Sequence, residues 1–464
     1  MACWLRINKL VGLSFCALLF AGYGSAQTPQ ALTLKQAVDL AVKNYPAIRA
    51  AGFQLAAAGL SVDQARTAYL PRTDLYLQMN RATRNNTFGL ILPNSVIPGI
   101  SGPVLGEAST GGTWGSAAGL LFAWEPFDFG LRKAKVDLAE ALRKKAQAGA
   151  ALTEYEVSQA AAATFLAAAA AKESVRAAQA NVDRLQAFAA TVAVLVRSEL
   201  RPGADESRLQ AELARARTEL IAAEQTGQEA RAALAGWLGQ GGQLVEIDSG
   251  GILKPAPPDS AESTPLRSHP LVESQSAEIG VTHARQKTLE KSYRPRFEIV
   301  SAVYARGSGA NVDGTFEGGA AGLAPSRGNW AVGLAVKFPI FDFKENRIRR
   351  EIETRYESAE QARMDVLMEE LKTREERARV QVAGARRIAE TTPVELTAAR
   401  TLEVQARARY QAGLGTVIEV AEAQRMLRQA EVDEALARLG VWRALLALAA
   451  ARGDMTRLLE QSNR

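Results

Sequence analysis

The chain has 464 residues, of which 47% are hydrophobic and 23% charged, and its formal net charge is +6. This length is ample for a large core, and charges of both signs are interspersed, which indicates a solvated surface and excludes a dedicated nucleic-acid-binding face. The only cysteines, Cys3 and Cys16, lie in the first 26 residues, so the rest of the chain can form neither a disulfide nor a thiolate metal site.

Residues 1–26 have the pattern of a secretory signal peptide. Arg6 and Lys9 precede an apolar run at 10–20, and small residues at 24–26 suit cleavage. The run is too short to span a membrane as a helix, and no later stretch of 18 apolar residues occurs. A closed sheet is then the remaining way for this exported chain to cross a membrane.

The sequence contains an internal repeat. Pro46 and Pro270 lie 224 residues apart, as do Pro71 and Pro295, and the motif that begins Phe127-Asp-Phe recurs 214 residues later. A duplicated unit of this size predicts two similar halves. We divide the chain into a first repeat, a linker, a second repeat and a C-terminal tail, at residues 27–239, 240–265, 266–452 and 453–464.

Each half is predicted to begin with a helix. Residues 33–69 have helical periodicity, with Thr33 as N-cap and Gln36 completing a capping box, and Pro46 interrupts or divides this helix. The linker is rich in Gly, Pro and Ser, and the tail is polar and expected to be loosely ordered.

Two strands then follow in each half. Alternating apolar residues predict them at about 72–81, 114–125, 296–306 and 329–339. Asp74 and Glu298 share one phase, whereas Leu75 and Ile299 share the other. This alternation of polar and apolar residues suits strands with one lipid-facing side and one polar side. A soluble, half-buried sheet is the alternative. The loops at 81–113 and 306–329 are expected to face outside.

Long helical hairpins complete each half. Residues 128–200 contain no proline, and at about 1.5 Å per residue this helix would be roughly 110 Å long. The second long helix, 344–412, contains Pro393 as an expected kink. Short turns at 201–203 and 413–415 lead into return helices at about 205–238 and 416–452. These carry heptads such as Leu213, Leu220 and Leu234, which predict coiled-coil packing.

Four strands cannot close a barrel, because open edges in lipid leave backbone groups unpaired. Two copies would give an eight-stranded barrel, whose interior is filled by its own side chains. Three copies would give a twelve-stranded barrel, which can enclose a lumen. We therefore expect a mainly α protein with a membrane β-barrel: a homotrimer with a shared 12-stranded barrel and a long α-helical coiled-coil barrel.

This organisation resembles the TolC-type outer-membrane efflux proteins, the channels of tripartite efflux and type I secretion systems. The resemblance rests on the element order, on Tyr-Leu-Pro at 69–71 and Tyr-Arg-Pro at 293–295, on both Phe-Asp-Phe motifs and on residues 410–423. It implies a trimeric channel-tunnel in the cell outer membrane, extending into the periplasm, that exports small molecules (drugs, toxic compounds) or proteins. It also implies a periplasmic adaptor (membrane fusion) protein, an inner-membrane RND or ABC transporter and contact with outer-membrane lipid.

The resemblance also implies site residues. Glu419 and Glu422 match acids that close the periplasmic end, and their i,i+3 spacing places them on one helix face. Asp205 and Tyr410 complete the expected gate, but an arginine that helps latch the tips in the family corresponds here to Gly415. The expected adaptor-contacting tip residues are Pro202, Gly203, Gly413, Leu414, Gly415 and Thr416, and the expected barrel-lumen residues are Asp74, Glu298 and Lys337.

Nothing in the sequence predicts an enzyme, a cofactor or a metal site. The histidines His269 and His283 show no ligand spacing, and Met364 and Met368 are better explained by packing than by soft-metal binding. Two other functions remain open: a non-conducting structural or adhesive coiled-coil protein of the envelope, and a periplasmic scaffold with a soluble sheet.

Overall fold

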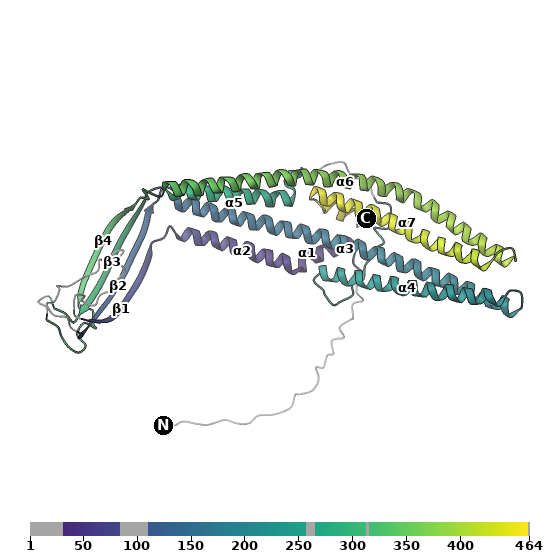
Figure 1. The fold of residues 1–464 in the computed structure, drawn as a ribbon, viewed down its shortest axis with the longest axis horizontal. Helices are drawn as coiled ribbons and strands as arrows, with labels where there is room; N and C mark the ends of the chain where they lie inside the picture. The colour runs from purple at the N-terminus through teal and green to yellow at the C-terminus, as the bar shows by residue number, and fades with distance from the viewer. Residues whose placement is uncertain (1–30, 84–109, 257–264, 312–314, 463–464) are drawn as a thin grey trace, which may run out of the picture.

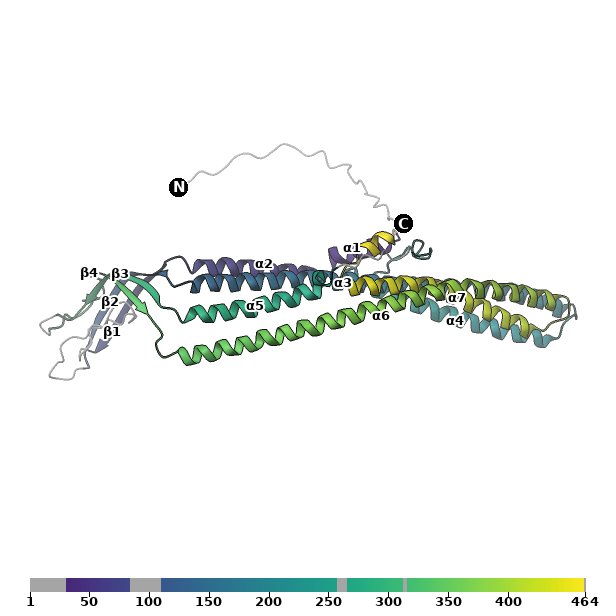
Figure 2. The same ribbon diagram turned by 90° about the horizontal axis from the view of Figure 1, so that it is seen from above.

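The computed structural model describes residues 31–83, 110–256, 265–311 and 315–462. The predicted signal peptide lies outside these residues, as does most of the loop predicted at 81–113. The molecule is elongated: a four-stranded sheet forms one end, and two long helical hairpins run side by side to the other end (Figure 1; Figure 2).

The first helical segment is divided at Pro46, as one of the two predicted outcomes. α1 (Leu34–Asn44) has the predicted capping box between Thr33 and Gln36, and α2 (Pro46–Thr67) has the proline in its first turn. Tyr45 between them is extended, which is the conformation that a following proline favours.

The four predicted strands form one antiparallel sheet in the order β1-β2-β3-β4. They are β1 (Arg72–Thr83), β2 (Gly112–Phe127), β3 (Arg296–Ser308) and β4 (Arg327–Lys337). The register pairs Asp74 with Leu121, Leu121 with Ala302, and Ala302 with Ala331. Asp74, Glu298 and Lys337 therefore share one side of the sheet, which we call the polar face.

The opposite side of the sheet is the apolar face. Large side chains on it are exposed, among them Leu77 (74%), Val303 (67%) and Trp330 (78%). These three residues come from β1, β3 and β4, so the apolar surface extends across the sheet.

The long helices form two hairpins, with short helices beside them. α3 (Leu131–Arg197) pairs with α4 (Gly203–Trp237), and α6 (Phe343–Gln411) pairs with α7 (Val417–Arg452). α5 (Pro270–Ser292), preceded by the 3₁₀ turn η1 (Leu266–Ser268), lies between α3 and α6. Pro393 lies inside α6, which continues past it.

The main hydrophobic core lies where the hairpins meet α1. Phe165 and Leu166 of α3 pack there with Leu34 of α1 and Leu439 and Trp442 of α7, all nearly inaccessible to solvent. The alanine-rich stretch of α3 contributes five buried alanines to the same core: Ala161, Ala162, Ala168, Ala169 and Ala170. Small side chains allow close approach of helix axes, so the alanine run serves packing as well as helix propensity.

Parts of the linker and of the C-terminal tail also belong to this core. Ile247 of the linker forms a parallel bridge to Leu32, and Ile252 is buried. The tail was expected to be loosely ordered, which is wrong: α8 (Thr456–Gln461) buries Leu458 against the core. The linker and the tail each contain only a few apolar residues among polar ones, which is too weak a signal to predict that they pack against the core.

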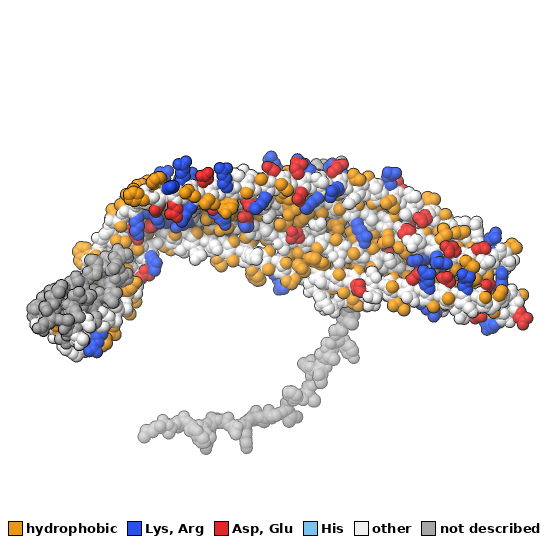
Figure 3. Space-filling view, viewed as in Figure 1, with side chains coloured by type: hydrophobic (Ala, Val, Ile, Leu, Met, Phe, Trp, Pro, Cys, Tyr) orange, Lys and Arg blue, Asp and Glu red, His pale blue; other side chains and the backbone are white. Residues whose placement is uncertain are grey.

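The helical surface carries charges of both signs interspersed with apolar side chains (Figure 3). Among the described helices, none combines the length and the apolar character that crossing a membrane requires.

Candidate functional site

The two hairpins turn at the end of the molecule farthest from the sheet (Figure 1). In the second tip, Gly413 adopts φ +81°, a left-handed conformation that ends α6 and that glycine adopts without strain. Thr416 then caps α7 by accepting a hydrogen bond from the backbone N–H of Glu419. The first tip has no side-chain cap, and α4 begins at Gly203 after Pro202.

Tyr410 connects the two hairpins at their tips. It is fully buried near the end of α6, and its hydroxyl donates a hydrogen bond to Oδ2 of Asp205 in α4, 3.1 Å away. Its ring packs edge-on against Phe188 of α3, with centroids 5.2 Å apart. The hydroxyl of Tyr410 therefore makes a hydrogen bond from one hairpin to the other.

Arg201 completes this cluster, which we call the tip clasp (Arg201, Asp205 and Tyr410). Its guanidinium lies 4.4 Å from the centroid of the Tyr410 ring, and Nη2 donates a hydrogen bond to the Tyr410 carbonyl at 2.5 Å. A cation over an aromatic face contributes about 0.5–2 kcal/mol. Although the resemblance places the latching arginine at Gly415, this chain supplies a cation from the first tip instead. Apart from the position of Arg201 in a turn, no signal in the sequence indicated this role.

The tip clasp holds Tyr410 in its protonated form. Burial raises the pKa of Tyr410 to about 12, and the neighbouring Asp205 carboxylate acts in the same direction. The hydroxyl is consequently a permanent donor at neutral pH, and the clasp does not titrate there through Tyr410.

Glu419 and Glu422 lie on the first turns of α7, with side chains 48% and 61% exposed. Each has an arginine partner in the same chain: Arg409 is 3.9 Å from Glu419, and Arg425 is 3.2 Å from Glu422. The two acids are thus accessible, but their charge is partly compensated, which the spacing of the acids alone did not indicate.

Three further ion pairs join the hairpins between the tips and the core, and none of them was predicted from the sequence. Arg184 of α3 binds Glu431 of α7 through both guanidinium nitrogens, at 3.1 and 2.9 Å. Arg425 and Arg428 of α7 reach glutamates of α4, namely Glu212 at 3.7 Å and Glu219 at 3.5 Å. Partly exposed pairs of this kind contribute little singly, so we regard them as fixing the register of the two hairpins.

Most of the predicted tip residues lie on the surface. Pro202, Gly203, Gly413, Leu414 and Thr416 are exposed, and Leu414 is 73% accessible. Leu200, also exposed, places a second apolar side chain at the first tip. Gly415 is buried, and a Cβ added at this position would lie only 3.2 Å from the Tyr410 backbone nitrogen. Gly415 therefore contributes close packing and not exposed surface.

The three predicted lumen residues lie on the polar face of the sheet at the end near the helices. Nζ of Lys337 is 2.7 Å from Oε2 of Glu298, and Asp74 pairs with Arg72 at 2.9 Å. The structure thus brings two of the three together and gives the third a partner of its own.

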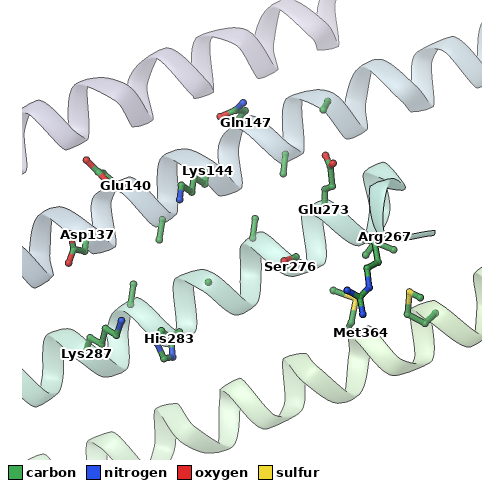
Figure 4. A pocket seen from close by; sticks show the side chains of 18 residues that line it. Asp137, Glu140, Lys144, Gln147, Arg267, Glu273, Ser276, His283, Lys287 and Met364 are labelled. Atoms are coloured by element: carbon green, nitrogen blue, oxygen red, sulfur yellow. The ribbon is translucent and has the colours of Figure 1, made fainter. Parts of the chain in front are cut away.

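A cleft of about 1020 Å³ lies between α3, α5 and α6 (Figure 4). Its lining mixes acids such as Glu140 and Glu273 with bases such as Lys144 and Lys287, and Met364 borders it. His283, which also lines the cleft, lies 3.4 Å from Glu357. Within the described parts of the chain, no three His, Cys, Asp or Glu side chains are grouped as metal ligands.

Comparison with known proteins places this geometry in a family. Residues 37–240 and 315–454 match the outer membrane efflux protein family. Protein CyaE of Bordetella pertussis is 26% identical over 443 residues, which cover 92% of this chain and 85% of that protein.

Two solved structures illustrate the shared fold. The CmeC outer membrane channel of Campylobacter jejuni has a TM-score of 0.72 at 14% identity and covers 92% of this chain and 89% of its own. The MtrE outer membrane channel of Neisseria gonorrhoeae has a TM-score of 0.69 at 16% identity. The match covers 91% of this chain and 89% of the MtrE chain. At these identities the likeness concerns the fold alone.

Proposed function

Because the chain belongs to the outer membrane efflux protein family, we propose that three copies assemble into one duct whose periplasmic end is closed by the hairpin tips. The protein is an outer-membrane channel for efflux or secretion that extends into the periplasm, and it is not an enzyme. A non-conducting coiled-coil protein of the envelope is not favoured, and neither is a periplasmic scaffold with a soluble sheet.

The sheet supports the assembly of several copies. β1 and β4 are its edges, and each has one side without a strand partner among the described residues. Unpaired backbone groups are not tolerated in hydrocarbon, so β1 of one copy would pair with β4 of the next. Three copies supply twelve strands, enough to surround a lumen lined by the polar face, with the apolar face toward lipid.

The tip clasp carries the proposal for the gate. Tyr410 and Arg201 tie the α6/α7 hairpin to the α3/α4 hairpin at the point where the duct narrows in the proposed assembly. Opening would require the hairpin tips to move apart, so the hydrogen bond to Asp205 would stabilise the closed state. The arginine pairs of α7 with Glu212 and Glu219 would oppose the same movement.

Glu419 and Glu422 would form an acidic ring at the same end. Two exposed carboxylates per copy give six in a trimer, where crowding makes them repel one another and attract cations. Arg409 and Arg425 reduce this field without cancelling it in our proposal, because Arg425 is shared with Glu212 and Arg409 lies 3.9 Å from Glu419.

An efflux channel of this family works with an adaptor and an inner-membrane pump in general. We propose that the adaptor is a periplasmic membrane fusion protein that contacts the exposed tips, including Leu200 and Leu414. The pump would be of the RND or ABC type. The cargo would be either small molecules or proteins, since both fit a duct of this kind.

The test is the mass and conductance of the full protein in detergent and in planar bilayers. We expect a trimer by light scattering, heat-modifiable migration in gels and a low conductance that reflects closed tips. A monomer or dimer would contradict the shared sheet, and a protein that leaves the outer-membrane fraction as a soluble species would contradict the lipid-facing apolar face.

A further inference from the structure

The polar face carries two separate groups of charges, one at each end of the strands. Counting by two from Glu298 along β3 leads to Arg306, and counting by two from Lys337 along β4 leads back to Arg327. The register shows no shift along this pair of strands and places Arg306 directly opposite Arg327. β3 starts after α5 and β4 ends before α6, so Arg306 near the end of β3 and Arg327 at the start of β4 lie at the end of the sheet away from the helices.

The charges near the helices are compensated. Lys337 pairs with Glu298 at 2.7 Å, and Arg72 pairs with Asp74 at 2.9 Å. These pairs leave little net field at that level of the polar face, apart from Arg296.

At the far end, the described residues do not compensate the charges. Within the described ranges, neither Arg306 nor Arg327 has a carboxylate within 4.0 Å. Their neighbours across the sheet are Ala117 in β2 and Gln78 in β1, so the row carries two positive charges and no negative one. Like charges opposite each other in adjacent strands destabilise the pairing, and this sheet contains such a pair without relief.

We propose that Arg306 and Arg327 form a binding site for anionic groups at the outer mouth of the channel. The proposal rests on the proposed trimer, in which the polar face lines the lumen and three copies bring six guanidinium groups to one level. Guanidinium binds carboxylate, phosphate and sulfate oxygens through two parallel hydrogen bonds, and low-dielectric walls focus such a field. The duct would then be acidic at its periplasmic tips and basic at its exit. Anionic groups would therefore be held at the basic exit and not at the acidic tips.

The test uses the purified full-length trimer in planar bilayers, with inorganic tripolyphosphate added to each side in turn. At about 0.1 M salt, where the Debye length is about 10 Å, we expect tripolyphosphate to reduce the current from one side only. The double variant R306Q/R327Q should raise the half-blocking concentration about tenfold or more, because it removes both guanidinium groups that bind the anion in each copy. At about 1 M salt the block should weaken, since the Debye length falls to about 3 Å.

Arg81 provides the matched control. It lies near the same end of the sheet, in β1, an odd number of residues from Asp74, which places it on the apolar face. There its guanidinium carbon lies 5.5 Å from the centroid of the Trp114 ring. R81Q should leave the block unchanged, whereas a block that depends on Arg81 would indicate an anion site on the lipid side and overturn the proposal.

Other outcomes are also decisive. An unchanged half-blocking concentration in R306Q/R327Q overturns the arginine site while leaving the channel intact. A trimer that conducts no current overturns the proposed duct and the site with it. The double variant removes a repulsion, so its trimer mass should be retained; if it fails to assemble, R306Q and R327Q are measured singly and each should show part of the shift.

Discussion

Tyr410→Phe is the most direct perturbation of the tip clasp. It removes the hydroxyl that donates to Asp205 but keeps the ring against Phe188 and beneath the Arg201 guanidinium. A hydrogen bond to a charged acceptor contributes about 1.5–3 kcal/mol, and we reduce this to about 1 kcal/mol because Asp205 is partly exposed and water can replace the donor.

The effect is expected to multiply in the assembly. If three tips open together, the loss is about 3 kcal/mol, which corresponds to a change in the open-to-closed ratio on the order of a hundredfold. The assay is single-channel recording in planar bilayers at neutral pH, with open probability as the readout.

The matched control is Tyr356→Phe. Tyr356 lies on the same helix, is 57% exposed and takes part in no hydrogen bond among the described residues. It should behave as the unmodified protein does. If Tyr410→Phe and Asp205→Asn both leave the open probability unchanged, the reasoning that the clasp stabilises the closed state is wrong.

Three further predictions concern other parts of the molecule. Glu419→Gln with Glu422→Gln should raise conductance and weaken block by divalent cations, and unchanged values for both would contradict the acidic ring. Burial lowers the pKa of His269, whose Nδ1 accepts a hydrogen bond from the Leu271 N–H while Nε2 contacts the Ala450 carbonyl. Because the unfolded chain then binds the proton more tightly than the folded chain, the free energy of unfolding should fall as the pH drops below about 6.5. Thermal unfolding of the His269→Gln variant should lose this acid dependence. Leu458→Ala should lower the free energy of unfolding by about 2–4 kcal/mol because the side chain is buried in the main core, whereas no change in denaturant midpoint would show that the tail is not docked.

The sequence predicted the parts of the fold that depend on local spacing. The capping box at Thr33, the division at Pro46 and the four alternating strands follow from residues a few positions apart. The same holds for the shared helix face of Glu419 and Glu422, because i,i+3 spacing on one helix suffices to place them together. Asp205 and Tyr410 were assigned to one gate only through a family resemblance, and their contact spans 205 residues of sequence.

What the sequence alone determined is therefore most of the helices and strands, their order along the chain and the sign of the charges on each. Periodicity, caps and turn residues act over a few positions and need no knowledge of the packed molecule. Tertiary structure alone decided that Arg201 covers Tyr410, that Arg184 binds Glu431, and that the linker and tail complete the core. Those contacts join segments far apart in the chain, and only the packing of whole helices fixes which of the many exposed arginines meets which partner.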